Sequence, residues 1–371
     1  NIHFGLTQIF LKMKYQKDKY ILNINDLSKL KEVYIYGTGI SSQKLKELIK
    51  RNSIDIKILG FVDSYKKTTI IDNLKIYNIK DFKHFDKTII ICTYYEEWID
   101  EIVNLLSKNG FNNYFINMII LDSEYILTKD NYYLFNEKIE YIKKVFSNDI
   151  DKRTWNSVID ALKNNINNLP LFENYYLYGN QQYLDCIDIN EDDIVIEGGV
   201  FDGITSLKIA EYLNSGKLYA FDPLIDNEKN ELFTNKKITI IKEALWNNTK
   251  DLYFVNCGAG SYVSENYTNI PSSQKYIKIK SQTVDNFIKD NEFTKFDFLK
   301  LDVEGAELNV LYGAIESIKK YRPKLAISIY HSLNDFFDIP YYLMNELQDY
   351  DFKIRLYSGA LMDTVLYAIP R

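Results

Sequence analysis

Short β-branched strands alternate with amphipathic helices twice along the 371 residues, and this alternation constrains the fold more than any other feature. Strand, helix and strand in succession predict a parallel sheet that helices cover on its faces. A prior of roughly 150 residues per domain leaves room for two such sheets. We therefore expect an α/β protein with two Rossmann-like, doubly wound domains at residues 1–120 and 189–371, joined by a helical connector at residues 121–188.

The first alternation predicts strands and helices between residue 32 and about residue 120. Its strands are expected at Glu32–Tyr36, Ile56–Val62 and Thr88–Cys92, where β-branched and aromatic residues dominate. One helix is expected around Leu45 to Ile49 and another at Glu96–Lys108, where Gly110 is a typical C-cap.

The second alternation begins near residue 193. Strands are expected at Ile194–Glu197, Lys217–Asp222, Ile238–Lys242, Asp297–Asp302, Leu325–Tyr330, Phe352–Tyr357 and Thr364–Ile369. Helices are expected near Thr205–Leu213, Val284–Lys289, Glu307–Tyr321 and Ile339–Leu347. Because only a short loop joins the last two strands, they are expected to pair antiparallel.

Composition narrows the classes of function. The net charge of −6 argues against binding a phosphate backbone, and hence against nucleic acid as a partner. No apolar run reaches the roughly 18 residues of a membrane span, and the first thirty residues do not resemble a signal peptide. The 3 cysteines are scattered, as in a reducing compartment. These features predict a cytoplasmic protein.

A glycine-rich turn, Glu197-Gly198-Gly199-Val200-Phe201-Asp202-Gly203, links the strand at residue 194 to the next helix. Open α/β sheets bind ligands at such turns, and about 25 residues later Asp222 could accept hydrogen bonds from a ribose diol. The turn matches neither the dinucleotide nor the triphosphate fingerprint, and Glu197 would repel a pyrophosphate. A negative charge there suits the sulfonium of S-adenosylmethionine. The alternative interpretation is that the segment is only a tight turn, and that the acidic residue only caps a helix.

The second alternation resembles the FkbM family of class I methyltransferases over about residues 182–368. The matching motifs are the glycine-rich turn, Tyr219-Ala220-Phe221-Asp222-Pro223, Phe298-Leu299-Lys300-Leu301-Asp302-Val303-Glu304-Gly305-Ala306-Glu307, Ala326-Ile327-Ser328-Ile329-Tyr330-His331 and the segment from Arg355 to Ala368. The resemblance implies O-methylation of a hydroxyl on a sugar or another small molecule, with S-adenosylmethionine as cofactor. This chain departs from the family's pattern at two positions. Glu197 stands where the family often carries Asp, and Leu356 stands where many members carry His.

The resemblance also implies which residues bind the cofactor. Glu197, Gly199, Phe201, Asp202 and Gly203 are expected at its methionine end, with Gly198 and Thr205 in the same set. Asp222 is expected to hold the ribose. Ala244 and Leu245 are expected near the adenine, although apolar residues after a strand are equally typical of a core.

Asp302, Glu304 and His331 are the candidate catalytic residues. Asp302 is expected to position the acceptor or the cofactor. His331 is a candidate general base because its ordinary pKa is near 6.5, and a structural histidine is the alternative. A divalent ion, Mg²⁺ or Ca²⁺, could bind to the carboxylates of Asp302, Glu304 and Glu307. We favour the interpretation that these acids complement the dipole of the helix that follows, and we predict no metal.

The first domain contains Gly37-Thr38-Gly39 and, about 24 residues later, Asp63, which imitates a dinucleotide site with Ser42 in place of the third glycine. The domain is similar to Rossmann-like modules of bacterial surface-sugar enzymes, which implies a nucleotide or sugar-nucleotide ligand. A docking or dimerisation module is the alternative. An NAD-dependent oxidoreductase and a non-catalytic binding module remain the competing functions for the whole chain.

Overall fold

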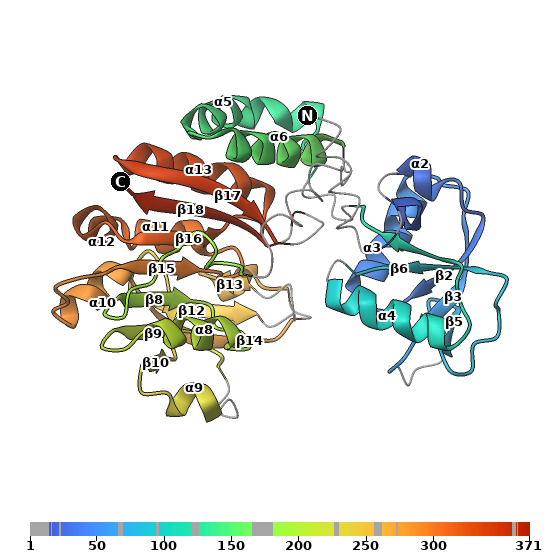
Figure 1. Ribbon diagram of the computed structural model, residues 1–371, viewed down its shortest axis with the longest axis horizontal. Coiled ribbons are helices and arrows are strands. Elements are labelled where there is room, and N and C mark those ends of the chain that lie inside the picture. The colour runs from blue at the N-terminus through green and yellow to red at the C-terminus, as the bar shows by residue number, and fades with distance from the viewer. Residues whose placement is uncertain are drawn as a thin grey trace. The chain divides into compact units, whose positions relative to one another are not determined.

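The computed structural model describes residues 15, 17–21, 24–65, 70–93, 96–119, 126–164, 181–225, 230–255, 262–271, 274–357, 361 and 363–371. The chain divides into two compact units, drawn in Figure 1. The N-terminal unit comprises residues 1–132, 153–179 and 356–362, and the C-terminal unit comprises residues 133–152, 180–355 and 363–371. Each unit is α/β, which confirms the expected class.

Within the described residues, the N-terminal unit carries a seven-stranded sheet in the order β1-β7-β6-β2-β3-β5-β4. The strands are β1 (Tyr20–Ile21), β2 (Glu32–Tyr36), β3 (Lys57–Asp63), β4 (Ile70–Ile71), β5 (Leu74–Asn78), β6 (Thr88–Ile91) and β7 (Tyr114–Asn117). All neighbouring strands pair in parallel except β4 with β5. The helices are η1 (Lys17–Lys19), α2 (Ile24–Leu27), α3 (Ile40–Arg51) and α4 (Glu96–Lys108). The strands and helices predicted here are all present.

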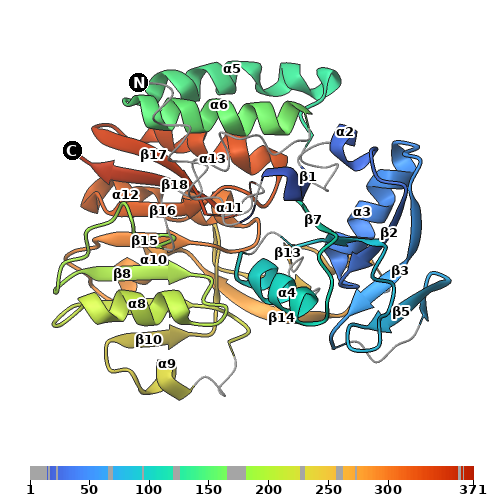
Figure 2. The ribbon, with the colours of Figure 1, turned by 45° about the vertical axis from the view of Figure 1, so that its right-hand side comes forward.

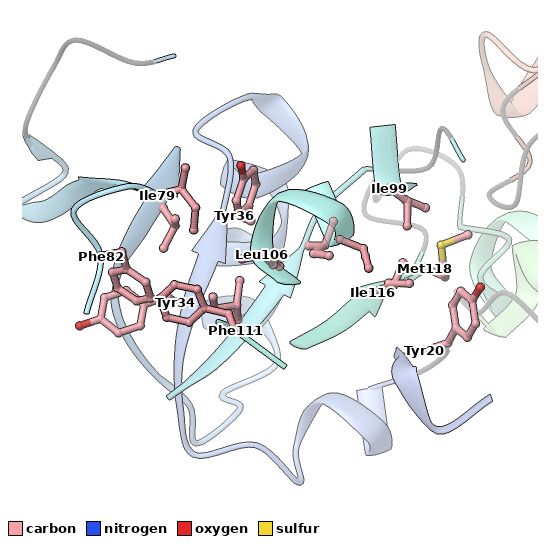
Figure 3. Close-up of a cluster of buried hydrophobic side chains, with 14 residues drawn as sticks. Tyr20, Tyr34, Tyr36, Ile79, Phe82, Ile99, Leu106, Phe111, Ile116 and Met118 are labelled. Atoms are coloured by element: carbon pink, nitrogen blue, oxygen red, sulfur yellow. The ribbon is translucent and has the colours of Figure 1, made fainter. Parts of the chain in front are cut away.

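Hydrophobic side chains cover both faces of this sheet. Side chains alternate along a strand, so Val33 and Ile35 of β2 point to one face and Tyr34 and Tyr36 to the other. The first pair packs with leucines of α3, and the second pair packs with Leu106 of α4 (Figure 3). A parallel sheet with helices on both faces is the doubly wound arrangement that the sequence predicts.

The C-terminal unit carries a second sheet, seven-stranded in the described residues, in the order β10-β9-β8-β15-β16-β18-β17. Its strands are β8 (Ile194–Gly198), β9 (Lys217–Phe221), β10 (Ile238–Ile241), β15 (Phe298–Leu301), β16 (Lys324–Ser328), β17 (Tyr350–Leu356) and β18 (Thr364–Pro370). The strands from β10 to β16 pair in parallel, and β18 runs antiparallel to β16. Both views place α9 (Asn230–Thr234) beside β10 and α13 (Leu333–Glu346) beside β17 (Figures 1 and 2).

Two predicted helices differ from the structure. The helix expected at Glu307–Tyr321 is two helices, α11 (Glu307–Tyr312) and α12 (Ile315–Tyr321), separated at Gly313. A Cβ atom at Gly313 would lie 2.2 Å from the carbonyl oxygen of Trp246, so this close approach requires glycine. Helix α13 begins six residues earlier than expected because Ser332 caps it, accepting a hydrogen bond from the amide of Asp335 at 3.1 Å. The remaining helices of this sheet are α8 (Ile204–Tyr212) and α10 (Val284–Asp290).

A small sheet that the sequence analysis did not predict is inserted between β10 and β15. It contains β11 (Ala244–Leu245), β12 (Asp251–Val255), β13 (Tyr262–Ser264) and β14 (Tyr276–Gln282), with η3 (Tyr267–Asn269) after β13. Ala244, Leu252 and Ile279 pack with Ala306 in one hydrophobic cluster, so the sheet supports the loop after β15. The alternation Ile277-Lys278-Ile279-Lys280 was the available sequence signal.

The predicted connector contains helices α5 (Lys129–Val145) and α6 (Asp149–Asn164), and its residues 165–180 lie outside the described part of the chain. Phe135 of α5 packs on Phe337 of α13, with ring centroids 4.6 Å apart. Asp151 is fully buried and contacts Arg355 at 2.5 Å, which fixes the start of α6 to β17.

None of the described helices combines the length and apolar character of a membrane span. Cys92 and Cys186 carry free thiols, whereas Cys257 lies outside the described residues.

Candidate functional site

The glycine-rich loop after β8 lies directly against the end of β15. Gly199 has a φ of +81°, and a Cβ atom there would lie 1.8 Å from the carbonyl oxygen of Asp302. Gly203 has a φ of +83°, and a Cβ atom there would lie 2.3 Å from Leu232. Both positions therefore need glycine for conformation and for close packing. The loop therefore brings the β8 motif and the Asp302 motif together.

Asp222 follows β9 and is bonded to the same loop. One carboxylate oxygen accepts hydrogen bonds from the amides of Val200 and Phe201, each at 3.2 Å. The other oxygen accepts from the amide of Leu224 at 2.9 Å. An ionised carboxylate offers about four acceptor positions, so capacity for a ligand's hydroxyls remains.

Glu197 lies beneath the loop and is fully buried. Ser206 donates a hydrogen bond to it at 2.5 Å, and the ammonium of Lys300 lies 3.3 Å from its other oxygen. Burial raises the pKa of Glu197, and Lys300 and Ser206 oppose that shift. Lys300 also donates to the carbonyl of Gly199 at 2.5 Å. The negative charge predicted beside the turn is therefore compensated by a buried lysine.

The other predicted cofactor residues differ in exposure. Phe201 has a φ of +50° and a side chain 86% exposed. Asp202 is exposed and accepts from the amide of Ile204 at 3.0 Å, while Thr205 is half-buried. Ala244 and Leu245 are buried in β11, which leaves both the core and the adenine interpretation of these two residues open.

Asp302 is the centre of a polar network at the ends of β15 and β16. The hydroxyl of Tyr183 donates to one carboxylate oxygen at 2.8 Å, and the hydroxyl of Tyr330 donates to the other at 3.2 Å. Burial alone would raise the pKa of Asp302, but Lys300, His331 and the hydroxyl of Tyr183 outweigh it and hold the pKa below its ordinary value. Asp302 is therefore ionised at neutral pH.

His331 is surrounded by three carboxylates. Its Nδ1 lies 3.0 Å from Glu307, and its Nε2 lies 3.3 Å from Asp302 and 3.6 Å from Glu304. Burial lowers the pKa of His331, but Glu307, Asp302 and Glu304 together raise it to about 10. The sequence prediction assumed the ordinary pKa near 6.5 for His331, and the three carboxylates overturn that assumption. The ring is therefore protonated at neutral pH.

Glu304 is the most accessible carboxylate of this group, with a side chain 45% exposed. Its φ is +54°, which is unusual for a residue other than glycine. Burial raises its pKa to about 7, with Asp302 and Glu307 adding to the shift and His331 opposing it. Glu304 therefore exchanges a proton near neutral pH.

Ligand atoms of Asp302, Glu307 and His331 lie within 4.8 Å of one another, which is close enough to surround a cation. However, Glu307 is fully buried and its two oxygens accept from the amides of Val303 and Gly305, at 2.7 and 3.0 Å. These bonds and the imidazolium compensate its charge, so we assign no metal to the group.

Several residues of the site were absent from the prediction. Lys300 lies in the Asp302 motif, two residues before Asp302, and this spacing could have indicated that it belongs to the site. Tyr183, Gln182 and Asp363 reach the site from segments before β8 and before β18, and no motif marks them. The pKa of Asp363 is raised to about 6 by burial and by Asp302, which adds to the acidic character of the site.

The glycines of the N-terminal unit and Asp63 also meet. Gly37 follows β2 with a φ of +89°, and Thr38 donates to Asp63 at 2.9 Å. A Cβ atom at Gly39 would contact nothing within 4 Å, and α3 begins at the next residue. These residues lie at the carboxyl ends of β2 and β3, next to the point where the strand order reverses.

The sheet of the C-terminal unit and the site at its carboxyl edge define a methyltransferase class of fold. Five parallel strands, the antiparallel β18 between β16 and β17, and a glycine loop after β8 form the arrangement that the resemblance implies. Comparison with known proteins agrees. Residues 193–354 match the methyltransferase FkbM domain, and residues 29–116 match the C2185-like N-terminal domain. The C-terminal unit is therefore a methyltransferase domain of the FkbM family, as predicted.

One solved structure gives the same assignment for the fold. The methyltransferase FkbM from Methylobacillus flagellatus KT superposes with a TM-score of 0.62 at 16% identity, covering 99% of this chain and 98% of that chain. An rRNA methylase from Streptococcus thermophilus covers 49% of this chain and 90% of its own, at 14% identity and a TM-score of 0.31. A search of curated protein sequences found no match.

Proposed function

We propose that the C-terminal unit transfers a methyl group from S-adenosylmethionine to a hydroxyl of a sugar or glycan precursor. The observation that carries the proposal is the meeting of the glycine loop, Asp222 and Asp302 at one edge of the sheet. This edge is where open α/β sheets bind their ligands. The resemblance supports the proposed sugar acceptor, and the composition of the sequence supports a proposed cytoplasmic location.

The residues at this edge fit the chemistry of the cofactor. Asp222 lies against the loop with acceptor capacity for a ribose diol. Phe201 presents an exposed aromatic ring from the same loop, and aromatic faces attract cations. S-adenosylmethionine, when bound, supplies an electrophilic methyl group on a positively charged sulfur. The buried pair of Glu197 and Lys300 supports the loop from below.

The protein then needs to align the acceptor. Asp302 is ionised and held by two tyrosine hydroxyls, so it can accept a hydrogen bond, in a fixed direction, from a sugar hydroxyl next to the one that is methylated. Alignment of the acceptor with the methyl group can supply several kcal/mol of the barrier, on the order of 7 or more in favourable cases. Asp302 is therefore assigned to positioning the acceptor.

Glu304 is assigned to receiving the proton of the hydroxyl that is methylated, whereas Asp302 holds the neighbouring hydroxyl. A general base works best when its pKa is near the working pH, and the pKa of Glu304 is raised to about 7. His331 already carries a proton at that pH, so it is assigned to compensating the charges of Asp302 and Glu307. The sequence prediction gave His331 the role of base.

The experiment incubates the full chain with S-adenosylmethionine and a panel of sugars and glycan precursors. Mass spectrometry should detect a product that has gained one CH2, and the ¹³C shift of the new methyl group distinguishes oxygen from nitrogen. Asp302→Asn should remove the product. A product that carries N-methyl, or one formed equally by Asp302→Asn, would contradict the assignment.

We infer a second small-molecule site in the N-terminal unit, for a nucleotide or sugar nucleotide. The hydrogen bond from Thr38 to Asp63 and the open space at Gly39 favour it. UDP-sugar or NAD should raise the melting temperature, and Asp63→Ala should abolish the shift. The absence of any shift would instead favour a docking or dimerisation module. Stabilisation by NAD together with hydride transfer would favour an oxidoreductase.

A further inference from the structure

Tyr183 connects several parts of the methyltransferase site. It belongs to the segment before β8, and its hydroxyl donates to Asp302 at 2.8 Å. The same hydroxyl lies 3.1 Å from Ser328, the last residue of β16. The ammonium of Lys300 lies 5.0 Å from the centre of the tyrosine ring, and the residue is only 3% exposed. The buried side chain of Tyr183 therefore contacts Lys300 of β15, Ser328 of β16 and Asp302, which follows β15.

The direction of these hydrogen bonds can be deduced. A phenol has one proton, and an ionised carboxylate can only accept, so the proton of Tyr183 points to Asp302. Its oxygen accepts from the side-chain amide of Gln182 at 3.0 Å. Gln182 also donates to Asp363 at 3.4 Å. On this segment, Tyr183 donates to Asp302 and Gln182 orients the Tyr183 hydroxyl by donating to its oxygen.

The backbone at Tyr183 is unusual. Its φ is +70°, a left-handed conformation that costs an aromatic residue about 1–2 kcal/mol. Such a conformation persists only where the surroundings determine it, and residues of this kind cluster at functional sites. The contacts with Asp302, Ser328 and Lys300 are the surroundings that determine it here.

We propose that Tyr183 is a positioning residue for methyl transfer, whose hydroxyl fixes the rotamer of Asp302. The proposal rests on the proposed function of Asp302. With one oxygen held by Tyr183, the carboxylate holds the acceptor in one orientation. Without that bond, Asp302 can rotate away, and a misplacement of about 1 Å can cost on the order of 100-fold in rate. Binding of the cofactor at the glycine loop and Asp222 does not depend on this bond.

The test is Tyr183→Phe in the full chain, which removes only the hydroxyl. Tyr350→Phe is a matched control, because the hydroxyl of Tyr350 is also buried and donates to the carbonyl of Pro323 at 3.0 Å, at the opposite end of β16. Tyr183→Phe should lower kcat at least about tenfold and leave the KM for S-adenosylmethionine and the Kd for S-adenosylhomocysteine within about twofold. Tyr350→Phe should leave all three within about twofold. A kcat of Tyr183→Phe equal to that of the control would overturn the proposal.

A second measurement does not depend on catalysis. The ¹³C signal of the Asp302 carboxyl should titrate at higher pH in Tyr183→Phe, because the hydrogen bond favours the ionised form, and should not move in Tyr350→Phe. An unchanged titration would overturn the role of the hydroxyl even if kcat falls. A wild-type chain that binds no S-adenosylhomocysteine and methylates nothing would instead refute the proposed function, whatever this titration gives.

Discussion

At the scale of single residues, the charges around Asp302 decide what each group can do. Lys300 and the hydroxyl of Tyr183 keep Asp302 ionised, while three carboxylates keep His331 protonated. Glu304, which is partly exposed, is left as the group whose pKa lies near 7. The proposed division into a positioning acid, a charge-compensating imidazolium and a proton acceptor follows from these shifts.

Glu304→Gln tests the proton acceptor. Turnover should fall by about 100-fold, the lower range of general-base contributions. In the wild type, kcat should rise with pH through about 7 as Glu304 ionises, and this rise should be absent in the variant. The pH profile of kcat measures both effects. Glu316→Gln, on the exposed face of α12, is the control and should keep the wild-type profile. A wild-type profile in Glu304→Gln would refute the assignment.

His331→Asn tests the imidazolium through stability. The pKa of His331 is raised from 6.5 to about 10, so its stabilising contribution is complete below pH 6.5 and is lost as the pH rises through 10. The free energy of unfolding of the wild type should exceed that of the variant most at pH 6, and the gap should narrow between pH 7 and 10. Denaturant unfolding across this range measures it. A gap independent of pH would mean that His331 is neutral. Turnover should fall while affinity for S-adenosylhomocysteine is kept.

At the scale of elements, close backbone contacts bring the two motifs of the site together. Gly199 allows the loop after β8 to touch the end of β15, and Lys300 of β15 bonds back to that loop. The small sheet packs its hydrophobic cluster against Ala306, in the loop after β15. The geometry of the site thus depends on elements that contribute no charged group to it.

Gly199→Ala tests the contact between the loop and β15. The new methyl group would overlap the carbonyl of Asp302 at a positive φ, so we expect a loss of about 1–3 kcal/mol in the free energy of unfolding. Binding of S-adenosylhomocysteine should weaken as well. Gly39→Ala is the control, because its Cβ meets open space and its φ is −76°, and it should change stability by less than about 0.5 kcal/mol. Equal effects of the two substitutions on denaturant unfolding would argue against the packing explanation.

Asp151→Asn tests the attachment of α6 to β17. Asp151 is fully buried against Arg355 and also accepts from the amide of Ile354 at 3.0 Å. Leaving the buried arginine without its counter-charge should cost about 3–5 kcal/mol in the free energy of unfolding. The exposed pair of Lys319 and Glu346 is the comparison, since Glu346→Gln should cost less than about 1 kcal/mol. A loss below about 1 kcal/mol in the free energy of unfolding of Asp151→Asn would show that its ion pair with Arg355 is dispensable.

Element types were largely predictable, and long-range side-chain contacts were not. Strand alternation located β8, β9, β15 and β16, and the motif after β15 located Asp302 and Glu304. The break at Gly313 depends on the carbonyl of Trp246, which no local pattern reveals. The pKa of His331 depends on three carboxylates that the fold brings together, so its charge could not be read from sequence.

At the scale of the whole molecule, two α/β units carry two candidate ligand sites of different chemistry. The C-terminal unit has an acidic site with a buried lysine beneath its loop, which suits a sulfonium cofactor. The N-terminal unit has an uncapped helix beside Asp63, which suits a nucleotide. Methyl transfer to a sugar and recognition of a sugar nucleotide are compatible activities for one chain.

The central claim is that the glycine loop and Asp222 of the C-terminal unit bind S-adenosylmethionine. Isothermal titration calorimetry with S-adenosylhomocysteine, on the wild type and on Asp222→Ala, tests it most directly. We predict saturable binding at one site, weakened at least about tenfold by Asp222→Ala because a charged hydrogen bond contributes about 1.5–3 kcal/mol. Asp251→Ala, an exposed carboxylate of the small sheet, should bind like the wild type. No binding by the wild type, or equal affinity in Asp222→Ala, would contradict the account.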